Sequence, residues 1–75
     1  MADRTLDTSG LVCPMPILKA RKALAEMAAG AILEVLATDP AAPKDFLAFC
    51  KATGNSLMES GKREGHYWFL IRRAA

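Results

Sequence analysis

Two prolines separated by one residue, Pro14 and Pro16, constrain the fold of this 75-residue chain more than any other feature. Proline has a fixed φ and no N–H, so it suits the first turn of a helix and disrupts a helix interior. Apolar residues then recur at steps of three and four, at Ile17, Ala20, Leu24 and Met27. This spacing predicts an amphipathic helix from about Pro14 to Ala29, with Gly30 as its left-handed stop.

Cys13 stands directly before this helix start. Unpaired N–H groups of the first turn and the positive end of the helix dipole would both favour the thiolate, which is the reactive form of cysteine. Pro14 disfavours helical geometry at Cys13 and so leaves the thiol on the flank of the helix. A free cysteine can instead be a small buried hydrophobe, but the flanking prolines favour a reactive thiol.

Three basic residues, Lys19, Arg21 and Lys22, follow the cysteine within two helical turns. Nearby positive charge would further favour the thiolate, and later a persulfide anion. The alternative for each of them is an ordinary solvated helix face. Together with Leu18 they are candidate contacts for a partner protein.

The remaining segments alternate between strands and a second helix. Asp39 is the expected cap of that helix, with Pro40 near its first position and Pro43 delaying regular helix until about 42–44. The predicted elements are a strand from Arg4 to Thr8, a strand from Ile32 to Thr38, a helix ended by Gly54-Asn55, and strands from Ser56 to Glu64 and from Tyr67 to Arg73 that form a hairpin near Gly65. The order β-α-β-α-β-β predicts one domain over residues 1–75, a two-layer α/β (α+β) sandwich with both helices on one face of a four-stranded mixed sheet.

Alternation along the strands assigns a core face and an open face to the sheet. The expected core positions are Leu33, Val35, Ala37, Tyr67, Phe69 and Ile71, covered by a helical stripe of Phe46, Phe49, Cys50 and Thr53. The open face would carry Ile32, Leu36, Trp68 and Leu70. Such an apolar patch either marks a partner surface or shows that one strand is assigned to the wrong face.

Composition excludes several classes of protein. No apolar run approaches the roughly 20 residues of a membrane span, and Met1-Ala2-Asp3-Arg4 lacks the order of a signal peptide. A cytoplasmic, reducing setting is expected, where two cysteines stay free thiols. The net charge of +2 does not by itself indicate a nucleic-acid partner. One histidine and two distant cysteines fall short of a C-x-x-C pair or a zinc site.

The other candidate reactive residues are assigned structural roles. Cys50 falls mid-helix beside Phe49 and is predicted to be buried and inert. His66 is predicted to be a solvated residue at the hairpin tip, not a partner for Cys13. A nucleophile without acid–base or oxyanion groups is suited to holding a chemical group and passing it on, while a partner supplies the rest.

The chain resembles the TusA/SirA-like sulfur carrier proteins over essentially its whole length. The resemblance rests on Leu6-Asp7, Gly10, Cys13-Pro14-Met15-Pro16, Arg21-Lys22, Asp39-Pro40, Phe49-Cys50 and Leu70-Ile71-Arg72. The C-P-x-P element before the first helix is the hallmark of that family. Gly10, Pro14, Met15 and Pro16 are accordingly expected to position Cys13.

The resemblance implies the same β-α-β-α-β-β sandwich. It also implies that Cys13 accepts sulfur as a persulfide from a cysteine desulfurase or a rhodanese-like donor and delivers it to an acceptor protein. Destinations in such families include tRNA thiolation, molybdenum cofactor assembly and sulfur oxidation. Met15 stands where tRNA-thiolation members often have an acidic residue, which alters the surface that a partner would meet. The expected carrier is a monomer without a metal or cofactor, apart from the covalent sulfur.

Two other functions remain open at this level. A small RNA-binding or regulatory module would use the basic terminal hairpin and the aromatic residues of the open sheet face. Direct nucleic-acid binding is not expected, because the net charge is small and no basic stripe is visible. A thiol-redox regulator would form a mixed disulfide through Cys13 with a partner.

Overall fold

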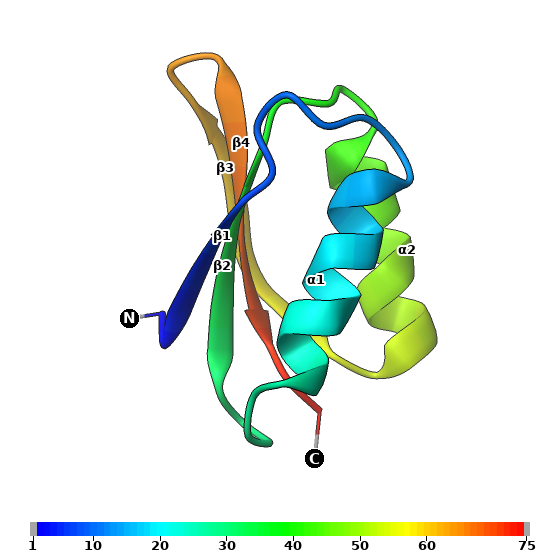
Figure 1. Ribbon diagram of the computed structural model, residues 1–75, viewed down its shortest axis with the longest axis vertical. Coiled ribbons are helices and arrows are strands. Elements are labelled where there is room, and N and C mark those ends of the chain that lie inside the picture. Colours follow the sequence, from blue (N-terminus) through cyan, green and yellow to red (C-terminus); the bar gives the residue numbers. More distant parts are fainter. Residues whose placement is uncertain (1, 75) are drawn as a thin grey trace.

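The elements follow one another in the predicted order in the computed structural model, which describes residues 2–74 (Figure 1). They are β1 (Arg4–Asp7), α1 (Met15–Ala25), β2 (Ile32–Ala37), α2 (Ala42–Thr53), β3 (Ser56–Arg63) and β4 (His66–Arg72). The predicted domain of residues 1–75 also includes Met1 and Ala75, which lie outside the described residues. Neither of the two helices within residues 2–74 is long and apolar enough to cross a bilayer.

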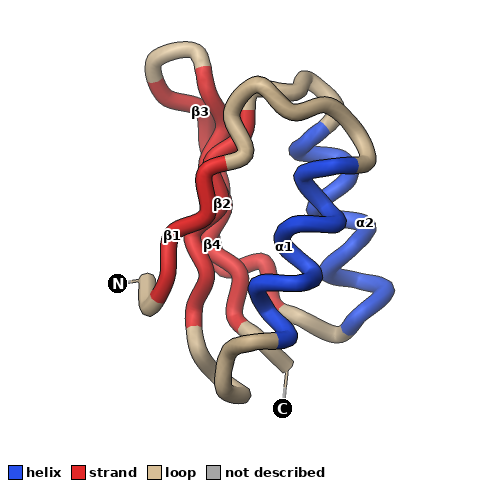
Figure 2. Tube along the Cα trace, viewed as in Figure 1, coloured by secondary structure: helices blue, strands red, loops and turns tan. Residues whose placement is uncertain are grey.

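Both helices cover the same face of a mixed sheet, so the predicted two-layer sandwich is confirmed (Figure 2). The strand order is β1-β2-β4-β3. Strand β1 runs parallel to β2, as expected for two strands joined through a helix, whereas β4 is antiparallel to both β2 and β3. The β1–α1 loop, the β2–α2 loop and the β3–β4 turn all lie at the same end of the sheet (Figure 1).

The core lies between the sheet and the helices, where the alternation predicted it. Leu33, Val35 and Ala37 of β2 are fully buried, and so is Phe46 of α2, whose ring stacks on Phe69 with 4.7 Å between centroids. The predicted α1 stripe also packs on this core: Ala20 and Leu24 are buried, and Ile17 and Met27 are partly buried. Burial of these aliphatic and aromatic side chains is the main contribution to stability in so short a chain.

Helix α1 ends earlier than predicted, at Ala25 instead of Ala29. The N–H groups of Glu26 and Met27 bond to carbonyls only three residues back, which tightens and ends the helix. Gly30 is therefore not the helix stop. Its N–H donates to the carbonyl of Arg73 at 3.0 Å and extends the β2–β4 pairing by one step. The pairing of Gly30 with Arg73 thus prevents the segment from Glu26 to Gly30 from continuing α1.

Helix α2 starts at Ala42, within the predicted window, but Asp39 is not its cap. The N-cap is Ala41, because Asp39 to Ala41 form a turn in which the Ala42 N–H donates to the Asp39 carbonyl. Gly54 ends the helix as predicted, with φ +79° and its N–H bonded to the Cys50 carbonyl. Strands β1, β2 and β3 each end one residue earlier than predicted, while β4 is displaced one residue toward the N-terminus.

Thr53 is the one member of the predicted α2 stripe that is not buried. It lies in the last turn of the helix, where it faces an open hollow beside Arg21 and Asn55. Its hydroxyl donates to the Phe49 carbonyl at 2.8 Å and accepts from the Asn55 amide. The helical period places Thr53 on the core side, but in this last turn the side chain borders the hollow and stays exposed.

The β3–β4 hairpin turns through Glu64 and Gly65, both with positive φ, as a tight two-residue turn requires. His66 is thus the first residue of β4, paired with Arg63, and not the tip of the turn that was predicted. On the face away from the helices, Trp68 pairs with Leu36 and Gly61. Register places Ile32 and Leu70 on the same face, which confirms the predicted open face.

The open face is only half exposed because its side chains cover one another. The Arg63 guanidinium lies 5.9 Å from the Trp68 ring centroid, and the Trp68 indole crosses directly over Gly61. A Cβ on Gly61 would lie 2.9 Å from Cζ2 of Trp68. Glycine at position 61 therefore allows the only tryptophan to lie flat on the sheet.

Gly61→Ala is expected to destabilise the protein by about 1 kcal/mol, since the cost of overpacking exceeds the gain from a less flexible unfolded chain. Urea unfolding followed by Trp68 fluorescence measures the change in free energy. Ser60→Ala, at the neighbouring exposed position, should stay within about 0.5 kcal/mol of the parent. A Gly61→Ala protein as stable as the parent would contradict the close contact.

Candidate functional site

The loop between β1 and α1 carries Cys13 and is tied at three points to the segment that leads from β2 into α2. Thr8 is buried and bonds to the Leu36 carbonyl through its N–H and its hydroxyl, at 2.8 and 2.6 Å. The Gly10 N–H donates to the Thr38 hydroxyl at 2.9 Å, with Gly10 at φ +83°. These bonds hold the loop in one place against the second βα connection.

The third tie fixes Cys13 itself. Its backbone N–H donates to the Asp39 carboxylate at 2.8 Å, and the other oxygen of that carboxylate accepts the Ala41 N–H at 3.2 Å. Asp39 thus bridges the two loops, a role that the sequence did not reveal. The Cys13–Pro14 peptide bond is cis, and Pro14 occupies the N-cap of α1.

Cys13 is exposed, as predicted for a thiol on the flank of a helix. Exposed apolar side chains flank it in the chain: Met15 and Leu18 are 40% and 47% exposed, and Val12, which was not among the predicted site residues, is 67% exposed. Pro16, by contrast, is buried and anchors the first turn of α1. Val12, Met15 and Leu18, exposed apolar residues close to Cys13 in the chain, are called the hydrophobic patch below.

Few free N–H groups face the thiol, so the predicted cluster of unpaired amides is wrong. Pro14 and Pro16 have no N–H to offer. The Met15 N–H donates to the Val12 carbonyl at 2.9 Å, and the Leu18 N–H donates to the Pro14 carbonyl at 3.1 Å. The prolines that fix the helix start also remove the donors that would have stabilised a thiolate there.

The electrostatic surroundings of the thiol also differ from the prediction. The Asp45 carboxylate, which can accept a hydrogen bond from the thiol, raises the pKa of Cys13 above its ordinary value; desolvation and the negative charges of Asp45 and Asp39 act in the same direction. Each of these effects favours the neutral S–H form over the thiolate. This environment therefore favours the thiol, whereas the sequence predicted an environment that favours the thiolate.

The basic residues of α1 do not compensate for these carboxylates. Lys19, Arg21 and Lys22 are exposed, which agrees with the alternative that they form a solvated helix face. None of them is among the causes of the shift in the Cys13 pKa. The Arg21 guanidinium instead lies over the Phe49 ring, 5.9 Å from its centroid. The predicted electrostatic role of these three cations toward the thiol therefore stays a prediction.

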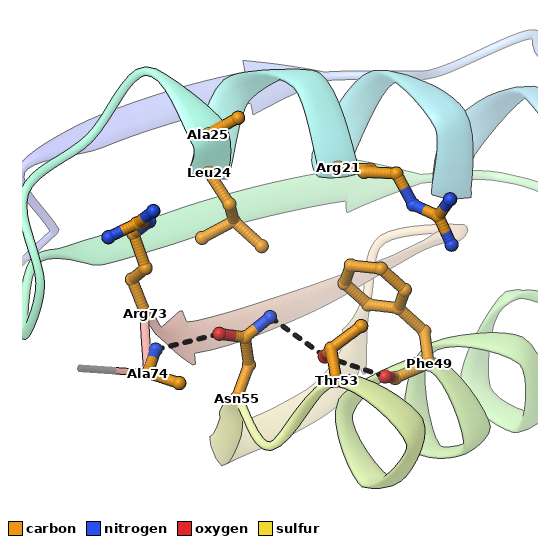
Figure 3. Close-up of a pocket in the computed structure, with 8 residues that line it drawn as sticks. All are labelled: Arg21, Leu24, Ala25, Phe49, Thr53, Asn55, Arg73 and Ala74. Carbon is orange, nitrogen blue, oxygen red and sulfur yellow. Dashed lines mark hydrogen bonds between the residues drawn. The ribbon is translucent and has the colours of Figure 1, made fainter.

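A hollow between α1 and α2 opens at Cys13. The α1 side of this hollow is lined by Cys13, Pro14, Ile17 and Arg21, and the α2 side by Asp45, Ala48, Phe49, Ala52 and Thr53. It continues into a second hollow at the other end of the helices, which shares Arg21, Phe49 and Thr53 and also reaches Arg73 (Figure 3). In that second hollow the Asn55 side chain links Thr53 to the Ala74 N–H. Both hollows thus lie between α1 and α2 and have Arg21, Phe49 and Thr53 in common.

The structure does not bring the other candidate residues to Cys13. Cys50 is 3% exposed, which confirms the prediction that it is buried. Burial raises the pKa of its thiol, and both cysteines are free. His66 lines a different hollow, on the open sheet face beside Glu34 and Trp68. Within residues 2–74, no group of three or more His, Cys, Asp or Glu side chains is arranged to hold a metal ion.

Asp45 is the site residue that sequence reasoning missed entirely. It lies in the first turn of α2, where an acidic residue is common because it complements the helix dipole. Nothing in the local sequence links Asp45 to a cysteine in the first loop. Their proximity arises only when the two helices pack side by side.

The fold and the site together define a class of small α+β proteins that present one exposed cysteine thiol at the start of the first helix. Within that class, the chain belongs to the TusA family: the family model described as Sulfurtransferase TusA matches residues 4–73. The family resemblance noted in the sequence is thereby confirmed.

Individual relatives agree with this assignment. The chain is 54% identical over 72 residues to the sulfur carrier protein TusA of Allochromatium vinosum, covering 96% of this chain and 95% of that protein. It is 41% identical to the sulfur carrier protein TusA of Pseudomonas entomophila, covering 97% of this chain and 91% of the relative. The crystal structure of a SirA-like protein from Desulfitobacterium hafniense superposes with a TM-score of 0.78 at 29% identity, covering 96% of this chain and 99% of the other.

Proposed function

We propose that this protein is a sulfur carrier that accepts a sulfane sulfur atom on Cys13 as a persulfide and relays it to an acceptor protein. Membership in the TusA family and the sulfur carrier names of its relatives support the carrier role. A carrier of this kind requires a sulfur donor and an acceptor. We propose a cysteine desulfurase or a rhodanese-like protein as the donor, and the reducing cytoplasm as the setting.

The observation that carries the proposal is the contrast between the two cysteines. Cys13 is exposed on a loop held by three hydrogen-bonded ties, whereas Cys50 is buried in the core. Sulfur exchange requires access to the attacking sulfur, so only Cys13 is suited to meet a protein-bound persulfide. The covalent sulfur is the cargo, and the proposal needs no separate cofactor.

The transfer balances without an oxidant. Cys13 sulfur attacks the terminal sulfur of the donor persulfide, a new S–S bond forms on Cys13, and the donor S–S bond breaks as the donor cysteine leaves as a thiolate. Delivery reverses these roles: a nucleophile of the acceptor takes the terminal sulfur and Cys13 leaves. The sulfane sulfur keeps its oxidation state throughout.

The surface around Cys13 supports docking of both partners in turn. The hydrophobic patch of Val12, Met15 and Leu18 offers an apolar centre, and the exposed Lys19 and Lys22 offer a charged rim. An apolar centre within a polar rim is the usual anatomy of a protein interface. We propose that the carrier acts as a monomer, because this surface has to be free for each partner.

Loading with labelled sulfur tests the proposal. The purified protein is incubated with a cysteine desulfurase and radiolabelled cysteine, and intact mass and peptide mapping follow. The expected result is a gain of one sulfur atom on the Cys13 peptide that a reducing agent removes. A protein that never gains this mass, or that gains it on Cys50, would refute the proposed function.

A further inference from the structure

Asp45 is a half-buried carboxylate beside the reactive cysteine, and the sulfur-carrier chemistry does not account for it. Asp45 and Cys13 line the same hollow, one from α2 and the other from the loop before α1. Among residues 2–74, the one salt bridge joins Arg4 to Glu26, at the far end of α1. Asp45 therefore stands next to the thiol without a cation of its own.

The other charged groups near Cys13 are already engaged. Asp39 accepts two backbone N–H groups, from Cys13 and Ala41, one on each carboxylate oxygen. Arg21 lines the same hollow, but its guanidinium lies over the Phe49 ring. Asp45 is thus the carboxylate in this hollow that is available to accept a hydrogen bond from the Cys13 S–H.

We infer that Asp45 is a positioning residue that accepts the S–H hydrogen bond of Cys13 and holds the unpartnered carrier in its unreactive thiol form. The inference rests on the proposed function, because it assigns Asp45 a role in loading Cys13. The thiolate is the nucleophile in sulfur exchange, so a carrier kept as a thiol resists alkylation and stray disulfide formation until its donor docks.

Loading of Cys13 with sulfur then requires that Asp45 no longer accept the hydrogen bond from the Cys13 S–H. A Lys or Arg side chain of the donor that pairs with Asp45 would neutralise the carboxylate and favour the thiolate instead. The proton leaves the Cys13 sulfur as it bonds to the terminal sulfur of the donor persulfide. The donor cysteine leaves as a thiolate when its S–S bond breaks and then takes up this proton, so the proton count of the exchange is unchanged. The docking surface of the donor is therefore expected to present a cation next to Asp45.

The test compares iodoacetamide alkylation of Cys13 across pH in the parent, Asp45→Asn, Asp45→Glu and Glu26→Gln proteins, with labelling measured on the Cys13 peptide. Asp45→Asn keeps the shape of the side chain and removes its charge. Asp45→Glu keeps the carboxylate. Glu26→Gln is the matched control, because it removes one negative charge from the opposite end of α1.

The expected result is a pH midpoint that falls in Asp45→Asn and stays near the parent value in Asp45→Glu and Glu26→Gln. Each tenfold gain in thiolate is partly offset by lower nucleophilicity, with a Brønsted coefficient of about 0.4–0.5, and so makes alkylation only about threefold faster at neutral pH. An unchanged midpoint in Asp45→Asn would overturn the inference. A purely structural role for Asp45 would not move the midpoint selectively with its charge.

Two features keep this test independent of folding and of the proposed function. First, the pH midpoint of Cys13 alkylation in the parent protein must lie above that of an unstructured cysteine peptide measured alongside. A parent midpoint at or below the peptide value overturns the inference, even if Asp45→Asn does not fold. Second, alkylation needs no donor protein. A parent that fails to load sulfur therefore refutes the carrier function, whereas a parent that loads sulfur but titrates like the free peptide refutes only the role of Asp45.

Discussion

Cys13→Ala is expected to abolish sulfur loading and to leave the fold intact. The side chain is exposed, and the tie to Asp39 runs through the backbone N–H of residue 13, which alanine retains. A surface substitution of this kind changes the free energy of unfolding by no more than about 0.5 kcal/mol. The loss of function should therefore be complete while the thermal midpoint and circular dichroism match those of the parent.

The matched control is the other cysteine. Cys50→Ala should keep full loading by a cysteine desulfurase and lose about 1 kcal/mol of stability, since it removes a buried sulfur from the core. Intact mass after loading, together with urea unfolding, separates the two variants. Residual sulfur on the Cys13→Ala protein would show that a second position carries the cargo and would contradict the assignment of Cys13.

Phe46→Ala is expected to have the largest effect on stability, about 3–5 kcal/mol, by leaving a cavity between α2 and the sheet. Phe46 is fully buried, its ring stacks on Phe69 at 4.7 Å, and it meets the edge of Phe49 at 6.4 Å. A domain of 75 residues has a total stability of about 4–11 kcal/mol, at roughly 0.05–0.15 kcal/mol per residue. The substitution thus removes a large part of that stability.

Urea unfolding monitored by Trp68 fluorescence gives the comparison. Leu47→Ala, at the next position on the outer side of α2, should cost less than about 0.5 kcal/mol, because Leu47 is 46% exposed. Similar losses for the two variants would contradict the assignment of Phe46 to the centre of the core.

The fold was predictable because its signals are local and consistent. The spacing of Ile17, Ala20 and Leu24 predicts which side of α1 is buried. Alternation in β2 and β4 predicts which face of the sheet meets the helices. These patterns are repeated along each element, so an error at one position does not change the assignment of the element.

Helix ends were less predictable, because strand pairing competes with helix formation there. The segment from Glu26 to Gly30 has a helical composition, yet the bond from the Gly30 N–H to the Arg73 carbonyl places its end beside β4. In the same way, Asp39 precedes a helix like a typical cap, but its carboxylate binds the Cys13 N–H across the fold. In both cases a contact with a distant part of the chain prevailed over a local preference.

For this protein, the sequence alone determined the order of the elements and favoured the correct faces of the sheet and an exposed Cys13, because each depends on residues close together in the chain. Only the tertiary structure decided the charge that surrounds the thiol. Pro14 and Pro16 remove the local amide donors, and the packing of α2 against α1 brings Asp45 to Cys13. Protonation depends on distances through space, and these exist only once the helices are side by side.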